Sequence, residues 1–390
     1  MMNLSLDDEK QALIDEVRHF VEREVLPVAH DLEHEDQYPD VLVEKLKELG
    51  MFSTTIPEAY GGLGLDFCTY ARMIEQLSRG WMSLSGVVNT HILVAYMLVA
   101  YGSEEQHQRF LPRMATGELR GALGLSEASG GSDVQAIAMT AERVGDDYLL
   151  NGSKLWVTNG VRAGVYAVLA RTDPASQPPH KGMSLFLVER DTPGVSTGRV
   201  FDKLGYKGVE TAEVLFEQVR VPAANLLGEH PGQGFKHVMS GLEVGRINVA
   251  ARAVGVAQAA FEDAIKYAQQ RQTFGQPIAQ HQAIQFKLAD MATRIEAARL
   301  LVEQAARKKD RGERCDLEAG MAKLFASEMC QHVTLEAMRI FGGFGYTREF
   351  NVERYYRDAP LMIVGEGTNE IQSLVIARQL LERYRLTDER

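Results

Sequence analysis

The sequence has few cysteines and no excess of positive charge. Its 390 residues include three cysteines, Cys68, Cys315 and Cys330, whose wide spacing matches no metal-binding motif. Unpaired thiols of this kind are typical of a reducing compartment. The formal net charge is −11, which argues against a nucleic-acid-binding function, because phosphate binding requires a basic face.

The N-terminus lacks the basic and apolar regions of a secretory signal peptide, since it opens with Asp7, Asp8 and Glu9. We therefore expect a cytoplasmic protein, although a processed chain of the mitochondrial matrix would look the same. Residues 86–101 approach a membrane span in length and apolarity, but Asn89 and His91 interrupt them. We expect a buried core helix there and no integral membrane segment.

Two further motif classes are missing. The chain shows no internal repeat, and its glycine run at residues 342–345 follows a helical pattern rather than a strand, so a Rossmann fingerprint is unsupported.

His30 and His34 have a spacing that can bind zinc on one helical face. No third ligand is evident and their neighbours are acidic, so we expect a solvated surface and no metal.

Three blocks of different pattern follow one another, as expected for a chain longer than one ordinary core. Residues 1–120 carry apolar side chains at helical spacing, and Pro27 is expected to bend or end the first helix. Residues 121–232 carry short strand-like runs, and residues 233–390 carry long helical runs. We predict an α+β, mostly α fold with an N-terminal helical domain, a middle antiparallel β-barrel domain and a C-terminal four-helix bundle.

The expected elements of the second and third blocks are defined by their apolar periodicity. The strands are Thr140–Val144, Tyr148–Leu150, Val165–Leu169, Ser184–Val188 and Val214–Phe216, with hairpin turns at Gly145–Asp147 and Asn151–Gly152. The bundle helices are Leu242–Gln269, Gln280–Lys308, Asp316–Ile340 and a last helix that begins near Thr368.

One short stretch near the end of the chain is typical of a catalytic base. An apolar segment, Leu361–Val364, leads into Glu366, which lies between Gly365 and Gly367. Thr368 can cap the helix that follows. Burial beside apolar residues raises the pKa of a carboxylate and allows it to act as a general base near neutral pH. On spacing alone, a turn with a solvated glutamate is the favoured interpretation, because Gly-Glu-Gly is common in loops.

Two stretches of the middle block are typical of a ligand site. Residues 123–133 combine small hydroxyl residues with glycines whose main-chain N–H groups can cradle a flat or phosphorylated ligand, or form a simple polar loop. Trp156 and Thr158 are two residues apart on an expected strand and so share one face, where they can pack against a planar ring or fill the core.

In this order, these stretches resemble those of the acyl-CoA dehydrogenase family. Four later motifs agree with the same family: residues 271–275, 340–343, 357–359 and 366–368. The likeness covers nearly the whole chain. It implies an FAD flavoprotein that forms a double bond between Cα and Cβ of an acyl-CoA thioester, passes electrons to an electron-transfer flavoprotein, and is a homotetramer arranged as a dimer of dimers.

The resemblance also assigns roles to residues. Glu366 matches the catalytic base, which removes the α-proton while the β-hydride leaves for flavin N5. A branch similar to isovaleryl-CoA dehydrogenase carries its base at the position of Gly245, and glycine excludes that alternative here. Matches to substrate contacts are Ser132, Glu243, Arg246 and Gly367. Matches to FAD contacts are Leu123, Leu125, Ser126, Trp156, Val157, Thr158, Arg271, Phe274, Gln282, Arg339, Gly343, Thr368 and Glu370. Of these, Arg271, Phe274, Gln282, Arg339 and Gly343 match residues that reach the FAD of a neighbouring subunit.

Three departures from the family pattern concern the details of binding. Many members have Pro-Gly-Ala where this chain has residues 128–130, and glutamine is frequent at Arg339. Gly365 replaces a tyrosine of medium-chain enzymes, so the acyl chain length stays open. An acyl-CoA oxidase or specialised flavin desaturase on the same scaffold is the alternative function, and a non-catalytic acyl-CoA-binding helical protein is the remote one.

Overall fold

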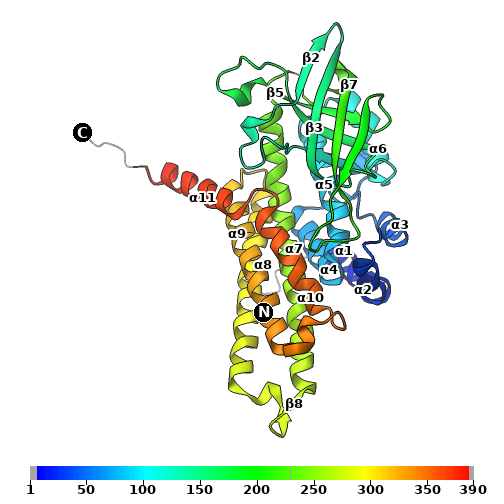
Figure 1. The fold of residues 1–390 in the computed structure, drawn as a ribbon. Helices are drawn as coiled ribbons and strands as arrows, with labels where there is room; N and C mark the ends of the chain where they lie inside the picture. The colour runs from blue at the N-terminus through cyan, green and yellow to red at the C-terminus, as the bar shows by residue number, and fades with distance from the viewer. Residues whose placement is uncertain (1–6, 229, 386–390) are drawn as a thin grey trace, which may run out of the picture.

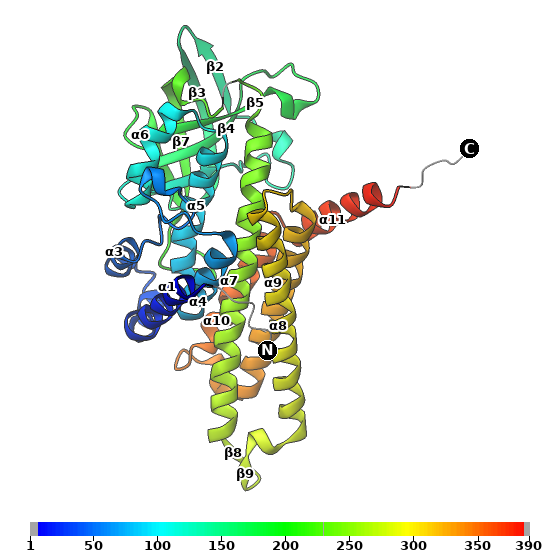
Figure 2. The same cartoon turned by 180° about the vertical axis from the view of Figure 1, so that it is seen from behind.

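The computed structural model describes residues 7–228 and 230–385 and shows helical, sheet and helical blocks in chain order (Figure 1). The first block lies along one flank of a long central helix, and the sheet lies beyond one end of the bundle (Figures 1 and 2). The helices of the first block are α1 (Asp8–Phe20), α2 (Leu26–His34), α3 (Asp40–Glu48), α4 (Phe67–Gly80), α5 (Met82–Tyr101) and α6 (Glu104–Ala115).

The first helical segment does not end at Pro27. A π-helical turn at Val21–Val25 joins α1 to α2, and Pro27 lies in the first turn of α2. Proline is tolerated in the first turn of a helix, where the missing N–H costs no hydrogen bond. Pro27 therefore does not end the helical segment, and that part of the prediction was wrong.

Helix α5 is the buried core helix that its sequence predicted. It is long and apolar enough to cross a membrane, with a hydropathy of 1.5 in its most apolar window, but 89% of that window is buried inside the protein. Asn89 and His91 are buried on this helix. Burial of His91 lowers its pKa to about 4, and its Nε2 lies 2.9 Å from the Phe52 carbonyl, which keeps the neutral ring satisfied within the core.

The middle block is one curled sheet. Its strands are β1 (Gly121–Gly124), β2 (Thr140–Val144), β3 (Asp147–Thr158), β4 (Val165–Arg171), β5 (Met183–Glu189), β6 (Val195–Val200) and β7 (Thr211–Pro222). Their order is β1-β4-β2-β3-β7-β6, with β5 on the other edge of β4. Most pairs are antiparallel, whereas β1 and β2 both pair with β4 in parallel. The predicted barrel-like antiparallel domain is thus a curled, mostly antiparallel sheet.

Strand β3 corrects two details of the prediction. Asn151 and Gly152 form no hairpin turn; they lie within β3, where the register with β7 shifts between Leu150 and Gly152. A second shift follows Lys154, and Trp156 has a φ of +61°. A bulge leaves one residue out of the ladder, so β3 is irregular here. Trp156 and Thr158 still share the face that the sequence implied, because Val157 between them is buried in the core of the sheet and they are not.

The third block contains the predicted long helices and one that the sequence did not reveal. These are α7 (Gly234–Gln270), α8 (Gln282–Asp310), α9 (Asp316–Phe341), α10 (Val352–Val364) and α11 (Asn369–Arg383), with a β8–β9 hairpin (Gln272–Thr273, Gln276–Pro277) between α7 and α8. Leu361–Val364 is the last turn of α10, which packs on α7 and α9 as the fourth helix of the bundle. Helix α11, predicted for that place, packs on α9 and projects outward (Figure 1).

Candidate active site

A cavity of about 920 Å³ opens where α5, the sheet, α7, α10 and the start of α11 meet. Its volume lies at the upper end of the range for small-molecule and cofactor sites, roughly 300–1,000 Å³. On α7 its wall follows one face of the helix through Phe235, Met239, Leu242, Arg246, Val249 and Arg252. The wall is exposed at the loop of residues 131–133 and also at Trp156, Leu204 and Val364. We call the Arg252 end of the cavity its closed end, because the wall residues Val249, Arg252 and Tyr206 are buried there.

Glu366 lines this cavity between α10 and α11. Its Oε1 accepts a hydrogen bond of 3.1 Å from Asn89 Nδ2. Burial raises the pKa of Glu366 above its ordinary value, and the positive charges of Arg252, Arg246 and Lys323, with the Asn89 bond, act in the opposite direction. The residue has a φ of +55°, a conformation that costs a non-glycine residue free energy and that collects at functional sites.

The backbone around Glu366 is held by Lys323 of α9, whose side chain is fully buried. Lys323 Nζ donates to the carbonyls of Ile363 at 3.0 Å and Gly367 at 2.9 Å, and to Asn369 Oδ1 at 2.9 Å. These acceptors lie on both sides of Glu366 and use all three N–H donors of an ammonium group. Burial lowers the pKa of Lys323 to about 8. Lys323 thus fixes the conformation of the glutamate loop.

Two glycines leave space for the reacting groups. A Cβ on Gly245 of α7 would lie 2.6 Å from Glu366 Oε2, so only glycine allows the carboxylate to occupy its position. A Cβ on Gly86 of α5 would lie 1.6 Å from the Tyr206 hydroxyl oxygen, and Tyr206 is a buried wall residue with a φ of +55°. Both close approaches determine the shape of the cavity beside Glu366.

The wall toward the sheet is suited to a planar ring. Trp156 is 58% exposed, an unusual value for an indole, and its ring packs at 4.3 Å on that of Phe201. Leu125, Ser126 and Thr158 lie in the same wall. An exposed indole held rigidly beside apolar and hydroxyl side chains fits a flavin ring, which needs stacking surface and hydrogen bonds at its edge.

The cavity brings together most of the predicted cofactor and substrate residues. Besides Leu125, Ser126, Trp156, Thr158 and Glu366, its wall contains Leu123, Ser132, Arg246, Gly367 and Thr368. Arg246 is buried, with Asp316 Oδ1 at 4.0 Å from Nη1 and no partner for Nε within the described chain.

Eight predicted residues lie outside the wall, and three of them belong to the elements around the cavity. Val157 is buried in the core of the sheet, and Glu370 is exposed in the first turn of α11. Glu243, predicted to contact substrate, is buried and accepts a 2.8 Å bond from Lys309 Nζ on α8. This ion pair occupies the Glu243 carboxylate, and Glu243 is not part of the cavity wall.

A separate group of predicted residues lies at the opposite end of α7. Arg271 and Phe274 are exposed at the β8–β9 hairpin, at the foot of the bundle in Figure 1, and Phe274 is 96% exposed. Gln282, Arg339 and Gly343 are exposed on the neighbouring ends of α8 and α9. None of these five residues belongs to the wall of the cavity in the described chain.

Sequence reasoning missed Asn89, Tyr206, Arg252 and Lys323 as parts of the site. Asn89 carried a signal, since it interrupts an apolar helix, and the same holds for Arg252, which stands among small apolar residues of α7. A buried polar residue in an apolar run requires a partner. Tyr206 and Lys323 are brought to the site by tertiary packing and carried no comparable local signal.

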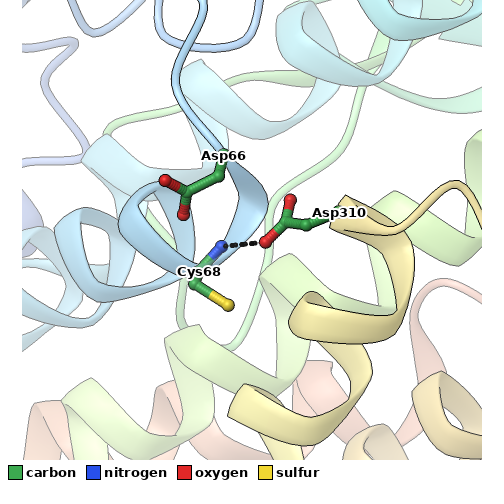
Figure 3. Close-up of side chains that lie close together, drawn as sticks. All are labelled: Asp66, Cys68 and Asp310. Carbon is green, nitrogen blue, oxygen red and sulfur yellow. Dashed lines mark hydrogen bonds between the residues drawn. The ribbon is translucent and has the colours of Figure 1, made fainter. Parts of the chain in front are cut away.

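Asp66, Cys68 and Asp310 place one oxygen or sulfur atom each within 4.8 Å of one another (Figure 3). Their oxygens already have partners at the start of α4. Asp310 accepts from the Phe67 and Cys68 N–H groups at 2.6 and 3.2 Å, and Asp66 caps the helix through Thr69 N–H at 2.7 Å. Burial raises the pKa of the Cys68 thiol, which disfavours a metal-binding thiolate. The cluster is a helix cap.

The histidine pair at residues 30 and 34 also has protein partners. His34 Nε2 lies 2.8 Å from Glu353 Oε1, and its Nδ1 lies 2.9 Å from the His30 carbonyl. His30 Nδ1 lies 3.0 Å from Asp31 Oδ1. These contacts join α2 to α10 and explain the histidines through packing between helices.

A buried carboxylate of raised pKa, set in a strained loop beside a cofactor-sized cavity with an exposed indole wall, defines an enzyme that combines a general base with a planar cofactor. Models of the acyl-CoA dehydrogenase N-terminal, middle and C-terminal domains match residues 7–118, 122–219 and 232–381. The chain belongs to the acyl-CoA dehydrogenase family, and it is an oxidoreductase whose cofactor is FAD.

Relatives and solved structures cover nearly the whole chain. An acyl-CoA dehydrogenase of Bacillus subtilis (strain 168) is 44% identical over 94% of this chain and 96% of its own length. Butyryl-CoA dehydrogenase from Megasphaera elsdenii has a TM-score of 0.95 at 39% identity, covering 97% of this chain and all of that one. A chain in a structure of the electron transferring flavoprotein of Acidaminococcus fermentans has a TM-score of 0.95 at 40% identity, with coverages of 97% and 100%.

Proposed function

We propose that the protein dehydrogenates an acyl-CoA thioester to the trans-2-enoyl-CoA, with Glu366 as the base that removes the α-proton. The observation that carries this proposal is the position of Glu366. Its carboxylate faces the cavity opposite Gly245, it has a raised pKa, and its loop is held by Lys323. Bound FAD supplies the oxidant for the β-hydride. The residues of this chain supply the base, its orientation and the exclusion of water.

The backbone of Glu366 supports the second requirement of the reaction, which is polarisation of the thioester. An α-proton is only weakly acidic, so a donor must stabilise the oxygen as the proton leaves. The Glu366 carbonyl accepts from Gln372 Nε2 at 3.2 Å, whereas its N–H donates no hydrogen bond to the described residues. That N–H is available to a thioester oxygen, next to the base that needs it.

The proposed electron acceptor is an electron-transfer flavoprotein. The likeness to a chain in the electron transferring flavoprotein structure supports it. An oxidase or specialised desaturase that uses oxygen remains the alternative function, and it is distinguished by whether oxygen or the flavoprotein reoxidises the enzyme during turnover.

The proposed assembly is a homotetramer arranged as a dimer of dimers. The exposed aromatic and basic residues at the β8–β9 end of the bundle support a contact with another copy, since an aromatic side chain as exposed as Phe274 marks an interaction surface more often than a solvated one. In this assembly Arg271, Phe274, Gln282, Arg339 and Gly343 would contribute to the FAD site of a neighbouring subunit.

The proposed location is the cytoplasm, or the mitochondrial matrix for a processed eukaryotic chain. Cys68, Cys315 and Cys330 are free thiols in the structure. Burial raises the pKa of Cys315 to about 12, and Cys330 is fully buried. Thiols in these positions are structural, which agrees with a reducing compartment.

The test is an anaerobic titration of the purified FAD-loaded protein with a panel of saturated acyl-CoAs, followed through the visible spectrum of the flavin. We expect bleaching by a subset of the panel and recovery of the oxidised spectrum when an electron-transfer flavoprotein is added. A protein that takes up no FAD, or a flavin that no acyl-CoA bleaches, contradicts the proposed dehydrogenation.

A further inference from the structure

Arg252 is a buried arginine in the wall of the cavity with few partners. It is 4% exposed. Its Nη2 donates to Asn248 Oδ1 at 3.0 Å, and its guanidinium lies 5.5 Å from the centre of the Tyr206 ring. Its Nε has no hydrogen-bond partner among the described residues. A buried guanidinium normally has its donors satisfied, because a charge removed from water is costly unless it is paired.

The other buried cations near the site have anionic or multiple acceptor partners. Lys309 pairs with Glu243 at 2.8 Å, Arg246 has Asp316 at 4.0 Å, and Lys323 has three oxygen acceptors. Arg252 forms no ion pair with any carboxylate of the described chain within 4.0 Å. Glu366 is the carboxylate whose charge acts on Arg252, Arg246 and Lys323 together. With Glu366 ionised, the closed end of the cavity therefore retains an excess of positive charge.

The position of Arg252 along α7 places this charge beyond the base. Gly245 faces the Glu366 carboxylate, and Arg252 follows it by seven residues, which is two helical turns on the same face and roughly 10 Å along the axis. Long side chains on a helix lean toward its N-terminus, so the guanidinium extends back toward the base. Arg252 is the last α7 residue of the wall, at the end opposite the exposed loop at residues 131–133.

We propose that Arg252 is a subsite for a carboxylate at the far end of the acyl chain, so that the substrates are short dicarboxylic acids joined to CoA through one carboxyl group. This inference rests on the proposed function, which places the thioester and the α-carbon beside Glu366. The acyl chain then extends from the base toward the closed end of the cavity, where its terminal carboxylate meets Arg252.

A carboxylate fits this position better than a neutral polar group. A guanidinium offers parallel N–H donors that match two carboxylate oxygens, and such charge-assisted pairs are stronger than neutral hydrogen bonds. The Tyr206 ring packs beside the guanidinium and restricts its movement. A plain alkyl end would leave the buried charge without compensation, and this penalty gives the pocket its selectivity.

The test compares acids with size-matched uncharged acyl groups in the FAD-loaded enzyme. Anaerobic flavin reduction is measured with succinyl-, glutaryl- and adipyl-CoA and with analogues in which a branched methyl pair replaces the carboxylate oxygens, such as 5-methylhexanoyl-CoA for glutaryl-CoA. We expect at least one diacid to be preferred by about tenfold or more. Arg252→Gln should lower kcat/KM for that diacid by about 100-fold more than kcat/KM for its uncharged analogue. Both values should also fall at low pH, because loss of the Arg252 charge raises the pKa of Glu366.

Two further variants complete the design. Arg252→Lys keeps the positive charge and should recover part of the preference for the diacid. It also provides a second test if Arg252→Gln does not fold. Arg113→Gln on α6, where the side chain is 43% exposed, controls for loss of a positive charge. The carboxylate subsite is overturned if the flavin of the wild-type enzyme is reduced by the uncharged analogues at least as well as by every diacid. The proposed dehydrogenation is not affected by that result. Equal losses for both substrate types in Arg252→Gln also overturn the carboxylate subsite, because Arg252 would then act through Glu366. A flavin reduced by no acyl-CoA overturns the proposed function itself.

Discussion

The two ends of α7 differ in the kind of residue that each places against its surroundings. Near the sheet, α7 carries the buried polar residues Glu243, Arg246, Asn248 and Arg252. At the other end, roughly 30–40 Å away by helical rise, the chain exposes an aromatic side chain, Phe274, and the nearby Arg271. Buried charge is stable only around a reacting ligand or a fixed partner, and exposed aromatic surface favours a second molecule. One helix thus joins the wall of the cavity to an exposed surface that meets another chain in the proposed assembly.

Among variants that test this difference between the two ends of α7, the largest effect on activity is expected at the end that lines the cavity. Glu366→Gln should lower the rate of flavin reduction by about four orders of magnitude, because the base is lost, while FAD and acyl-CoA still bind. The folded state raises the pKa of Glu366, so the ionised carboxylate destabilises the fold once the pH exceeds the pKa of the unfolded chain. The variant should therefore have an equal or higher Tm at pH 8, measured by calorimetry.

Glu382→Gln is the matched control for that variant, since Glu382 is exposed on α11. It should retain full activity. A Glu366→Gln enzyme with nearly wild-type flavin reduction would remove Glu366 from the mechanism.

Removal of the Lys323 hydrogen bonds to the loop that carries Glu366 is expected to have the next largest effect. Lys323→Met should lower kcat by about 100-fold, because a base displaced by about 1 Å loses that much. Lys323 also holds down the pKa of Glu366 through its charge. The acid limb of the pH–kcat profile, which falls as Glu366 is protonated, should therefore shift to higher pH in the variant. An unchanged acid limb would show that Lys323 has no electrostatic effect on the base.

At the opposite end of α7, smaller effects of a different kind are expected. Arg271→Ala should weaken FAD binding by about tenfold, the size of one lost charge-assisted hydrogen bond, and Phe274→Ser should increase the fraction of smaller assemblies. Both are measured by FAD release and by sedimentation, with kcat of the FAD-saturated enzyme nearly unchanged. Unaltered FAD affinity in Arg271→Ala would contradict the proposed difference between the two ends of α7. The β8–β9 end would then be ordinary solvated surface.

The smallest effect is expected away from both ends, at the start of α4. Asp66→Ala removes the N-cap and the ion pair with Lys10 at 2.8 Å, and should lower the free energy of unfolding by about 1 kcal/mol. Flavin reduction should not change, and added zinc should have no effect on the Tm of either protein. A zinc-dependent rise in the wild-type Tm alone would mean that the cluster is a metal site.

The order of the blocks and the long helices were predictable from sequence because their signal is local. Apolar spacing located α5 and α9 to within a few residues, and Thr368 was predicted as the cap of α11, which it is. Helix α10 was not predicted, and only its last four residues were noted as an apolar segment. It contains Pro360 and a buried arginine, Arg354, and such residues hide the apolar stripe that marks a bundle helix.

The site was predictable only in part for the same reason. Glu366, Trp156 and Thr158 lie in short motifs that carry information locally. The Asn89 bond to Glu366 and the Lys323 bonds to the same loop join residues that are 277 and 44 positions apart, and no local pattern encodes such pairs. The strained backbone at Trp156 and Glu366 is likewise imposed by the surrounding packing rather than by residue preference.

Gly245 limits how the base of this scaffold can move during evolution. A side chain at this position would collide with the Glu366 carboxylate, so a glutamate acquired at residue 245 would displace the existing base before it could replace it. A lineage that transfers the base from the α10–α11 loop to α7 must therefore lose the first carboxylate in the same step or pass through an impaired enzyme. In the proposed mechanism the two locations of the base exclude each other, and the absence of a side chain at Gly245 keeps this chain in the first.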